Sequence, residues 1–193
     1  MILFVGGLYN YYNFGNYILD VFSKKNKQIL FLPCRNVKQY DIDNCEILIA
    51  YSFAIQYLYK LDLQNIKKVI LLNPLLNNKK YKDGMIQMAD KLIEKKLPFN
   101  DLGIDLYLRI MGANPDTIPL WREDVYNYLN DFGPKEKEIE DIQVKDNWII
   151  MDGIKPVSKL PRIDDYATDN KGNKIRHILN YDNNLLFLDK YII

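Results

Sequence analysis

Ser52 is the residue of this chain whose surroundings best fit those of a reactive side chain. It follows a short aliphatic run, residues 47–50, and precedes a stretch with helical apolar spacing. Such a continuous run is typical of a buried parallel strand. The small residues Ala50 and Ala54 let strand and helix backbones pass closely, so the spacing predicts a nucleophile elbow with alanines in place of both glycines of G-x-S-x-G. The alternative is a helix N-cap, a common role for serine after a strand.

The length and composition of the chain favour a single folded domain. The chain has 193 residues, of which 48% are hydrophobic and 26% charged, so we expect a single domain over residues 1–193. The 26 basic residues nearly equal the 25 acidic ones, which gives no overall attraction to nucleic acid or to an anionic membrane. No run of eighteen apolar residues or secretory signal occurs, and we expect a soluble cytoplasmic protein.

Metal and nucleotide chemistry have little support in the sequence. The chain contains one histidine and two cysteines, Cys34 and Cys45, which form no spaced ligand set. Neither a P-loop nor a G-x-G-x-x-G fingerprint is present. We therefore expect no metal and no cofactor.

Short apolar runs alternate with helical patterns along the chain. Six runs predict strands, at residues 2–5, 28–32, 46–51, 68–72, 148–151 and 174–179. Helical spacing follows at residues 17–22 and 53–61 and ends the chain at residues 184–191. This alternation predicts an α/β fold with about six mostly parallel strands and helices on both faces of the sheet.

The alternation is interrupted after Pro74. Residues 75–145 contain helical spacing at 85–92, 102–110 and 121–129, punctuated by prolines. We interpret this segment as a helical lid that folds over Ser52, because its aromatic and aliphatic residues need burial and a reactive serine needs shielding from water. The expected walls of an apolar substrate pocket are Phe99, Tyr107 and Trp121.

The layout resembles the α/β-hydrolase superfamily over nearly the whole chain. The matching features are Gly6-Gly7 after the first strand, the segment from Ala50 to Ala54, the strand before Pro74, the inserted helices and a final strand, loop and helix. Among compact members it is similar to the small esterases that release pimeloyl-acyl carrier protein methyl ester in biotin synthesis. The resemblance implies a serine hydrolase that forms an acyl-enzyme on Ser52 and acts on a small acyl ester or an acyl carrier protein-linked one.

The same resemblance implies roles for four further residues. The oxyanion donors would be the backbone N–H groups of Leu8 and Phe53, the acid would be Asp152, and the base would be His177. The chain departs from the family pattern at two places: the segment Gly153-Ile-Lys-Pro156 has no aspartate where the usual G-x-x-D acid would stand, and residues 180–184 lack the usual histidine.

Three alternatives follow from these departures. Asp152 would cap the turn that it forms with Gly153, as aspartate before glycine often does. His177 would be a structural histidine within a strand. The whole protein would then be an inactive hydrolase fold that binds a ligand or a protein partner.

A local excess of lysine marks the start of the predicted lid. It would dock an acidic carrier protein, or it would simply form a solvated helix face. Its members are Lys79, Lys80, Lys82, Lys91, Lys95 and Lys96.

Overall fold

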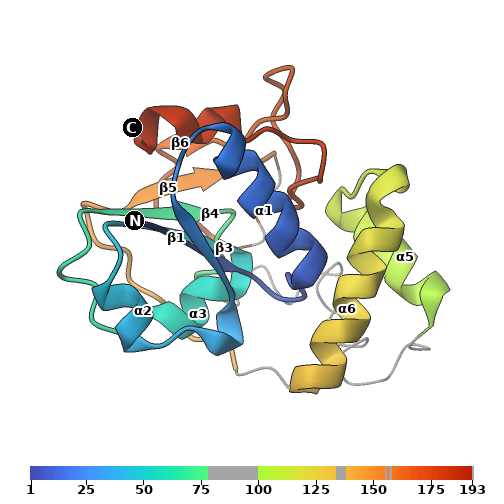
Figure 1. Cartoon of the computed structure of the whole chain (residues 1–193), viewed down its shortest axis with the longest axis horizontal. Helices are drawn as coiled ribbons and strands as arrows, with labels where there is room; N and C mark the ends of the chain where they lie inside the picture. Colours follow the sequence, from blue (N-terminus) through green and yellow to red (C-terminus); the bar gives the residue numbers. More distant parts are fainter. Residues whose placement is uncertain (78–99, 134–137, 155, 157, 193) are drawn as a thin grey trace.

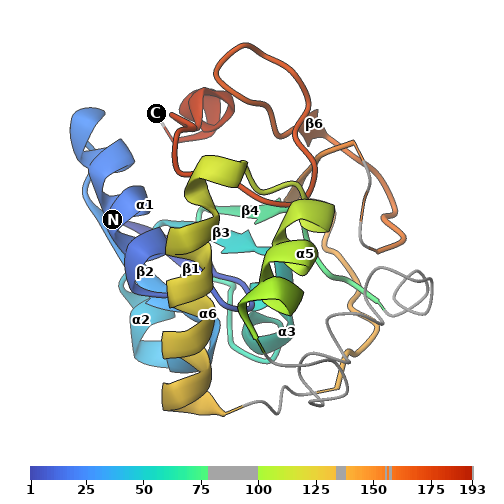
Figure 2. The same cartoon turned by 90° about the vertical axis from the view of Figure 1, so that its right-hand side faces the viewer.

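The fold is built on one six-stranded sheet (Figures 1 and 2). The computed structural model describes residues 1–77, 100–133, 138–154, 156 and 158–192. Strand order is β2-β1-β3-β4-β5-β6 and every neighbouring pair is parallel, which confirms the predicted α/β class. The strands are β1 (Ile2–Gly6), β2 (Ile29–Pro33), β3 (Ile47–Tyr51), β4 (Lys68–Leu72), β5 (Ile149–Asp152) and β6 (Asp165–Tyr166).

Side chains of the central strands alternate between two hydrophobic cores. Phe4 of β1 and Ile49 of β3 are register partners and contribute to one core, whereas the adjacent partners Leu3 and Leu48 contribute to the other. This follows from the two-residue period of a strand. All four side chains are fully buried, so both faces of the sheet must be covered.

Helices cover both faces. The first core includes residues of α1 (Tyr12–Lys24), α5 (Asp101–Met111), α6 (Ile118–Phe132) and the 3₁₀ helix η4 (Leu186–Tyr191). The second includes residues of η1 (Cys34–Asn36), α2 (Gln39–Asp43) and α3 (Ile55–Leu58). Two further 3₁₀ turns are η2 (Ser52–Ala54) and η3 (Pro115–Thr117). In Figure 1, α5 and α6 stand beside the sheet on the side where α1 begins.

A buried carboxylate joins α6 to the beginning of α1. Asp124 is fully buried and accepts hydrogen bonds from the backbone N–H groups of Tyr11 (3.1 Å), Asn13 (2.8 Å) and Phe14 (2.9 Å). The first N–H groups of a helix have no intrahelical acceptor, and the helix dipole favours a negative charge there. Asp124 therefore caps α1 from another element and fixes α6 against it.

The predicted sixth strand at residues 174–179 is wrong. The sixth strand is β6, which pairs with β5 and lies between the strands predicted at residues 148–151 and 174–179. Residues 174–179 form a loop, held by one antiparallel bridge between Thr168 and Lys174. Their buried residues Ile175, Ile178 and Leu179 follow no two-residue alternation, and they fill the first core from a loop.

The predicted insertion lies between β4 and β5. The helices expected at residues 102–110 and 121–129 are confirmed as α5 and α6, whereas the one at residues 85–92 lies outside the described residues. The expected last helix is the 3₁₀ helix η4. No helix in the described part of the chain has the length and apolar character needed to cross a membrane.

Candidate functional site

Ser52 lies on a strained turn at the end of β3. Its φ is 54°, in the left-handed region, and η2 begins with it. A residue other than glycine pays roughly 1–2 kcal/mol for this conformation. The strain turns the backbone sharply between strand and helix, and it leaves Ser52 only half-buried although Tyr51, Phe53 and Ala54 around it are buried. This is the strand–turn–helix context that a nucleophile elbow requires.

Gly7 lets the loop after β1 press against this turn. A Cβ atom on Gly7 would lie 2.8 Å from the Cβ of Ser52, 2.8 Å from the carbonyl oxygen of Tyr51 and 3.2 Å from the backbone nitrogen of Phe53. The first two distances are shorter than any side chain tolerates, so the approach requires glycine. The Gly7–Leu8 backbone therefore runs beside the N–H of Phe53.

The two expected oxyanion donors border the same pocket. Leu8 and Phe53 both line it, together with Ser52. Within the described residues, neither backbone N–H is taken up by a turn or loop hydrogen bond. Asn10 orders this loop, because its Oδ1 accepts a hydrogen bond of 2.6 Å from the N–H of Gly7. Two N–H groups on neighbouring backbones can stabilise a negative oxygen that develops between them.

His177 contacts Ser52 directly. The distance from Ser52 Oγ to His177 Nε2 is 2.7 Å, which is hydrogen-bond distance, although the residues are 125 positions apart. The imidazole lies in the loop after β6, and its ring stacks on that of Tyr51 with centroids 5.9 Å apart and an interplanar angle of 22°. A hydroxyl hydrogen-bonded to an imidazole can pass its proton to the ring as the oxygen attacks an electrophile.

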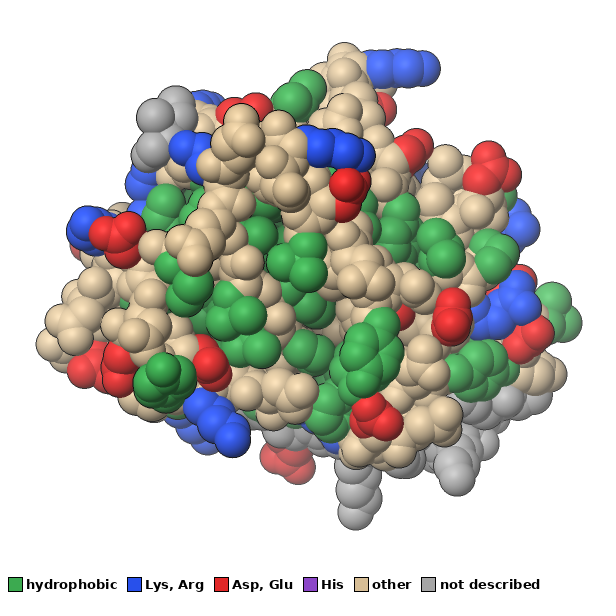
Figure 3. Space-filling model, in the orientation of Figure 1, with side chains coloured by type: hydrophobic (Ala, Val, Ile, Leu, Met, Phe, Trp, Pro, Cys, Tyr) green, Lys and Arg blue, Asp and Glu red, His purple; other side chains and the backbone are tan. Residues whose placement is uncertain are grey.

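Burial keeps the His177 imidazole neutral. Desolvation lowers the pKa of His177 to about 4, because a charged ring is disfavoured among apolar neighbours. No histidine side chain is seen on the face of the molecule drawn in Figure 3. Among the described residues Ser52 is the one hydrogen-bond partner of the ring, and in the neutral tautomer that carries its proton on Nδ1 the Nε2 atom accepts from the hydroxyl.

Asp152 lies close to the histidine loop without a hydrogen bond to the ring. It ends β5 and is only 1% exposed, and its Oδ1 accepts a 2.6 Å hydrogen bond from the N–H of Gly153. The following residues touch the histidine loop: the N–H of Ile154 donates to the carbonyl of Ile175 at 2.8 Å. The contact with Gly153 is the turn cap that we weighed as an alternative, and the role of Asp152 as the acid stays a prediction.

An apolar pocket opens beside Ser52 and His177. Its internal volume is about 60 Å³. Tyr107 from α5 and Trp121 from α6 are among its lining residues. Phe99 lies outside the described residues, as do all six lysines of the basic segment. No charged side chain lines the pocket in the described part of the chain. Its lining consists of Leu8, Tyr9, Asn10, Tyr51, Ser52, Phe53, Leu75, Tyr107, Leu108, Met111, Trp121, His177 and Ile178.

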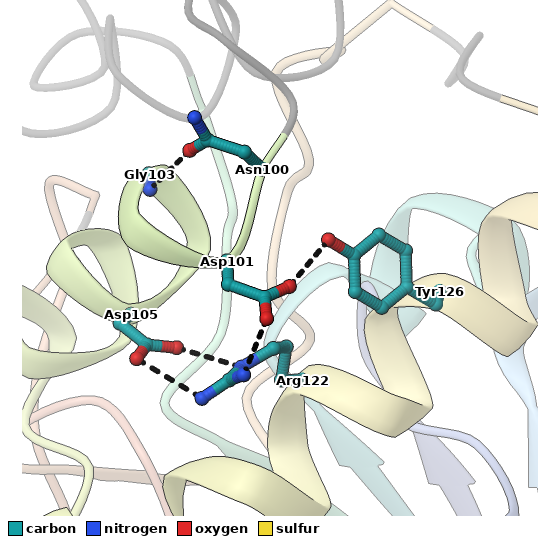
Figure 4. Close-up of polar contacts among 6 residues, drawn as sticks. All are labelled: Asn100, Asp101, Gly103, Asp105, Arg122 and Tyr126. Carbon is teal, nitrogen blue, oxygen red and sulfur yellow. Dashed lines mark hydrogen bonds and ion pairs between the residues drawn. The ribbon is translucent and has the colours of Figure 1, made fainter.

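The two pocket-lining helices are joined by an ion-pair cluster (Figure 4). Arg122 of α6 donates from Nε and Nη2 to the carboxylate of Asp105 in α5, at 2.9 and 3.1 Å, and from Nη1 to Asp101 at 2.7 Å. The hydroxyl of Tyr126 donates to the other oxygen of Asp101 at 2.8 Å. A two-point contact between a guanidinium and a carboxylate fixes orientation as well as distance. The cluster therefore sets how α5 and α6 present their inner faces to the pocket.

Sequence reasoning missed two residues that contact the histidine loop. Tyr51 ends the strand predicted at residues 46–51, and Asn73 stands between the strand predicted at residues 68–72 and Pro74. Both donate side-chain hydrogen bonds to the backbone carbonyl of His177. An asparagine directly after a buried strand was the one signal in the sequence that something other than packing occurs there.

The described residues were also searched for metal-ligand groups and the chain was compared with known proteins, and neither gives a match. No group of three or more potential ligand side chains that could hold a metal ion occurs in the described residues. Comparison with family models, with curated proteins and with solved structures gives no match to the chain.

Proposed function

We propose that this protein is a serine hydrolase that cleaves a small carboxylic ester or thioester through an acyl-enzyme on Ser52. The observation that carries the proposal is the 2.7 Å hydrogen bond between Ser52, held at a φ of 54°, and the single histidine of the chain. A strained, half-buried serine with a neutral base in contact is the arrangement that nucleophilic catalysis requires. The strand order supports a compact α/β-hydrolase arrangement in which the inserted helices α5 and α6 would belong to a lid.

The reaction follows from the placement of these groups. Ser52 Oγ attacks the carbonyl carbon of the ester while its proton passes to His177 Nε2, and the N–H groups of Leu8 and Phe53 stabilise the oxyanion. The intermediate collapses with loss of the alcohol or thiol, which takes the proton from the imidazolium. A water molecule then repeats the sequence on the acyl-enzyme and releases the carboxylic acid.

Asp152 is our candidate for the acid of this triad. Its carboxylate is buried close to the histidine loop and near enough to the Tyr51 phenol to help raise the pKa of that phenol. A negative charge at this place would stabilise the imidazolium that forms in the transition state. Catalytic hydrogen bonds are often long or unmade before substrate binds, so we propose that the His177 ring donates to Asp152 only in the complex with substrate.

The pocket favours a short, uncharged acyl group. Its lining is apolar and aromatic around the serine, with about 60 Å³ of space, and a charged acyl chain would lose its hydration there without a partner. We therefore expect p-nitrophenyl acetate and butyrate to be hydrolysed with kcat/KM at least about tenfold above that of p-nitrophenyl octanoate and of a succinyl ester.

The comparison between these esters also separates the parts of the proposal. A preference for the octanoyl or succinyl ester would contradict the short, neutral pocket but not the hydrolase. No hydrolysis of any ester by folded protein would contradict the hydrolase and favour a hydrolase fold that only binds a ligand or partner.

The depressed pKa of His177 predicts an unusual pH dependence. Because the base loses activity only when protonated, the acid limb of kcat/KM should have an apparent pKa near 4 rather than near the usual 6.5. Folding favours the neutral ring, so its stabilising contribution is complete above about pH 6.5 and is lost as the pH falls from 6.5 toward 4. As the pH falls over this interval, the midpoint temperature of thermal unfolding should drop more for the wild type than for His177→Gln. An acid limb of kcat/KM near pH 6.5 would contradict the depressed pKa of His177.

A further inference from the structure

One backbone atom in the loop that carries His177, the carbonyl oxygen of that residue, accepts hydrogen bonds from two side chains. The loop contains no strand or helix around the histidine, so its position depends on contacts with neighbouring elements, among them the sheet and the C-terminus of α5, where the carbonyl of Met111 accepts from the N–H of Ile178. The hydroxyl of Tyr51 donates to the carbonyl oxygen of His177 at 2.8 Å, and Nδ2 of Asn73 donates to the same oxygen at 2.6 Å. These donors come from the ends of the neighbouring strands β3 and β4.

Tyr51 holds the loop at three points. Besides its bond to the carbonyl of His177, its hydroxyl accepts a 3.1 Å hydrogen bond from the N–H of Leu179, and its ring stacks on the imidazole. The side chain is 2% exposed. Burial raises the pKa of the Tyr51 phenol far above its usual range, so the hydroxyl keeps the proton that it donates.

Asn73 is unfavourable for folding in two respects. Its φ is 46°, and its fully buried Oδ1 has no hydrogen-bond partner within the described residues. Strained backbone and an unpaired buried acceptor each cost free energy and concentrate at functional places. The side-chain amide of Asn73 donates from Nδ2 to the carbonyl of His177 and, at 3.5 Å, to the carbonyl of Arg176.

The same two strand ends also fix the serine. Tyr51 precedes Ser52 in the chain, and two residues after Asn73 the N–H of Leu75 donates to the carbonyl oxygen of Ser52 at 3.1 Å. The ends of β3 and β4 therefore hold both the turn that carries Ser52 and the loop that carries His177.

We propose that Asn73 and Tyr51 are positioning residues that hold the imidazole of His177 in line with Ser52 by jointly binding the backbone carbonyl of His177. The inference rests on the hydrolase function proposed above. Neither side chain takes a proton from the substrate or from Ser52; each acts only through the place that it gives to the ring. Misplacing a base by a fraction of an ångström to an ångström is enough to lower turnover strongly.

Two variants remove the donors while keeping shape. Asn73→Asp retains size and tolerance for positive φ but replaces the donating amine with an oxygen that repels the carbonyl, and Tyr51→Phe retains the ring that stacks on His177. Each should lower kcat roughly 10- to 100-fold with KM changed less than about threefold. The double variant should lose less than the product of the two, since both donors hold one atom.

Matched controls separate positioning from stability. Asn183→Asp removes the amide donor of another buried asparagine, which bonds the carbonyl of Thr168, and Tyr17→Phe removes another buried phenol that donates to a backbone carbonyl. Both should reduce thermal stability without the change in kcat.

The single histidine allows a second measurement that needs no activity. The Cε1–H group of the ring gives one ¹H–¹³C NMR signal, whose titration should move from a pKa near 4 toward the usual 6.5 in Tyr51→Phe, a variant that adds no charge, because a released loop hydrates the ring. Titrations and kcat indistinguishable from those of Asn183→Asp and Tyr17→Phe would overturn the inference. An inactive wild type would contradict the hydrolase proposal alone, and the titration would still decide on the anchoring of the ring.

Discussion

His177→Gln should lower kcat for ester hydrolysis by roughly four to six orders of magnitude, and Ser52→Ala should do the same. Glutamine has a similar polar reach and can still hydrogen-bond the serine hydroxyl, but it cannot accept its proton. Alanine removes the nucleophile itself. Because the two groups act as a unit, the double variant should be hardly slower than either single one.

Single-turnover hydrolysis of p-nitrophenyl butyrate, with thermal unfolding of each variant in parallel, measures this effect. The half-buried hydroxyl of Ser52 contributes little to packing, so Ser52→Ala should unfold close to the wild-type temperature. If His177→Gln stays within tenfold of the wild type, the base must be another group. The chain has no second histidine to supply one, and the proposed mechanism would then be wrong.

Asp152→Asn is the second variant with a large expected effect, a loss of about three to four orders of magnitude in kcat. In serine triads the same change leaves geometry intact but favours the wrong imidazole tautomer and removes the charge that stabilises the imidazolium. Asparagine keeps an oxygen in the place of Oδ1, so the hydrogen bond from Gly153 survives. A residue that served only as a turn cap would therefore tolerate the substitution.

Asp124→Asn provides the control for Asp152→Asn. Asp124 is equally buried, and its hydrogen bonds go to the N-terminus of α1. Its replacement should lower stability with little change in kcat. Wild-type turnover in Asp152→Asn would assign Asp152 to the turn and leave the acid of the triad to be found elsewhere.

The strands that could be predicted are those whose environment is uniform. β1, β3 and β4 are short aliphatic runs because a central parallel strand is buried on both faces, and the sequence shows such a run directly. β6 could not be predicted in this way, because Asp165 and Tyr166 at the sheet edge are two residues of mixed polarity. Residues 174–179 resemble a strand in the sequence because a loop that fills a core needs the same apolar residue types as a strand.

Some residues of the site can likewise be recognised from the sequence, and others cannot. Ser52 and Gly7 could be singled out because a sharp turn and a close backbone approach restrict residue type locally. Only the resemblance to the α/β-hydrolases implied that Ser52 would pair with His177. No local sequence pattern predicts this contact, since it joins residues 125 positions apart and depends on where a loop without regular structure is held. Asn73 and Tyr51 hold that loop through a backbone carbonyl, and every residue has one, so the partner leaves no trace in the sequence.

Covalent labelling with a fluorophosphonate, followed by mass mapping of the modified peptide, tests the central claim most directly. The probe reacts only with a serine that has a base to take its proton and donors to stabilise the adduct, so labelling reports the whole arrangement rather than the fold. We expect one adduct, on Ser52, that is absent in Ser52→Ala and slowed by orders of magnitude in His177→Gln. A well-folded wild-type protein that stays unlabelled, or that is labelled equally in Ser52→Ala, would contradict the assignment of Ser52 as the nucleophile.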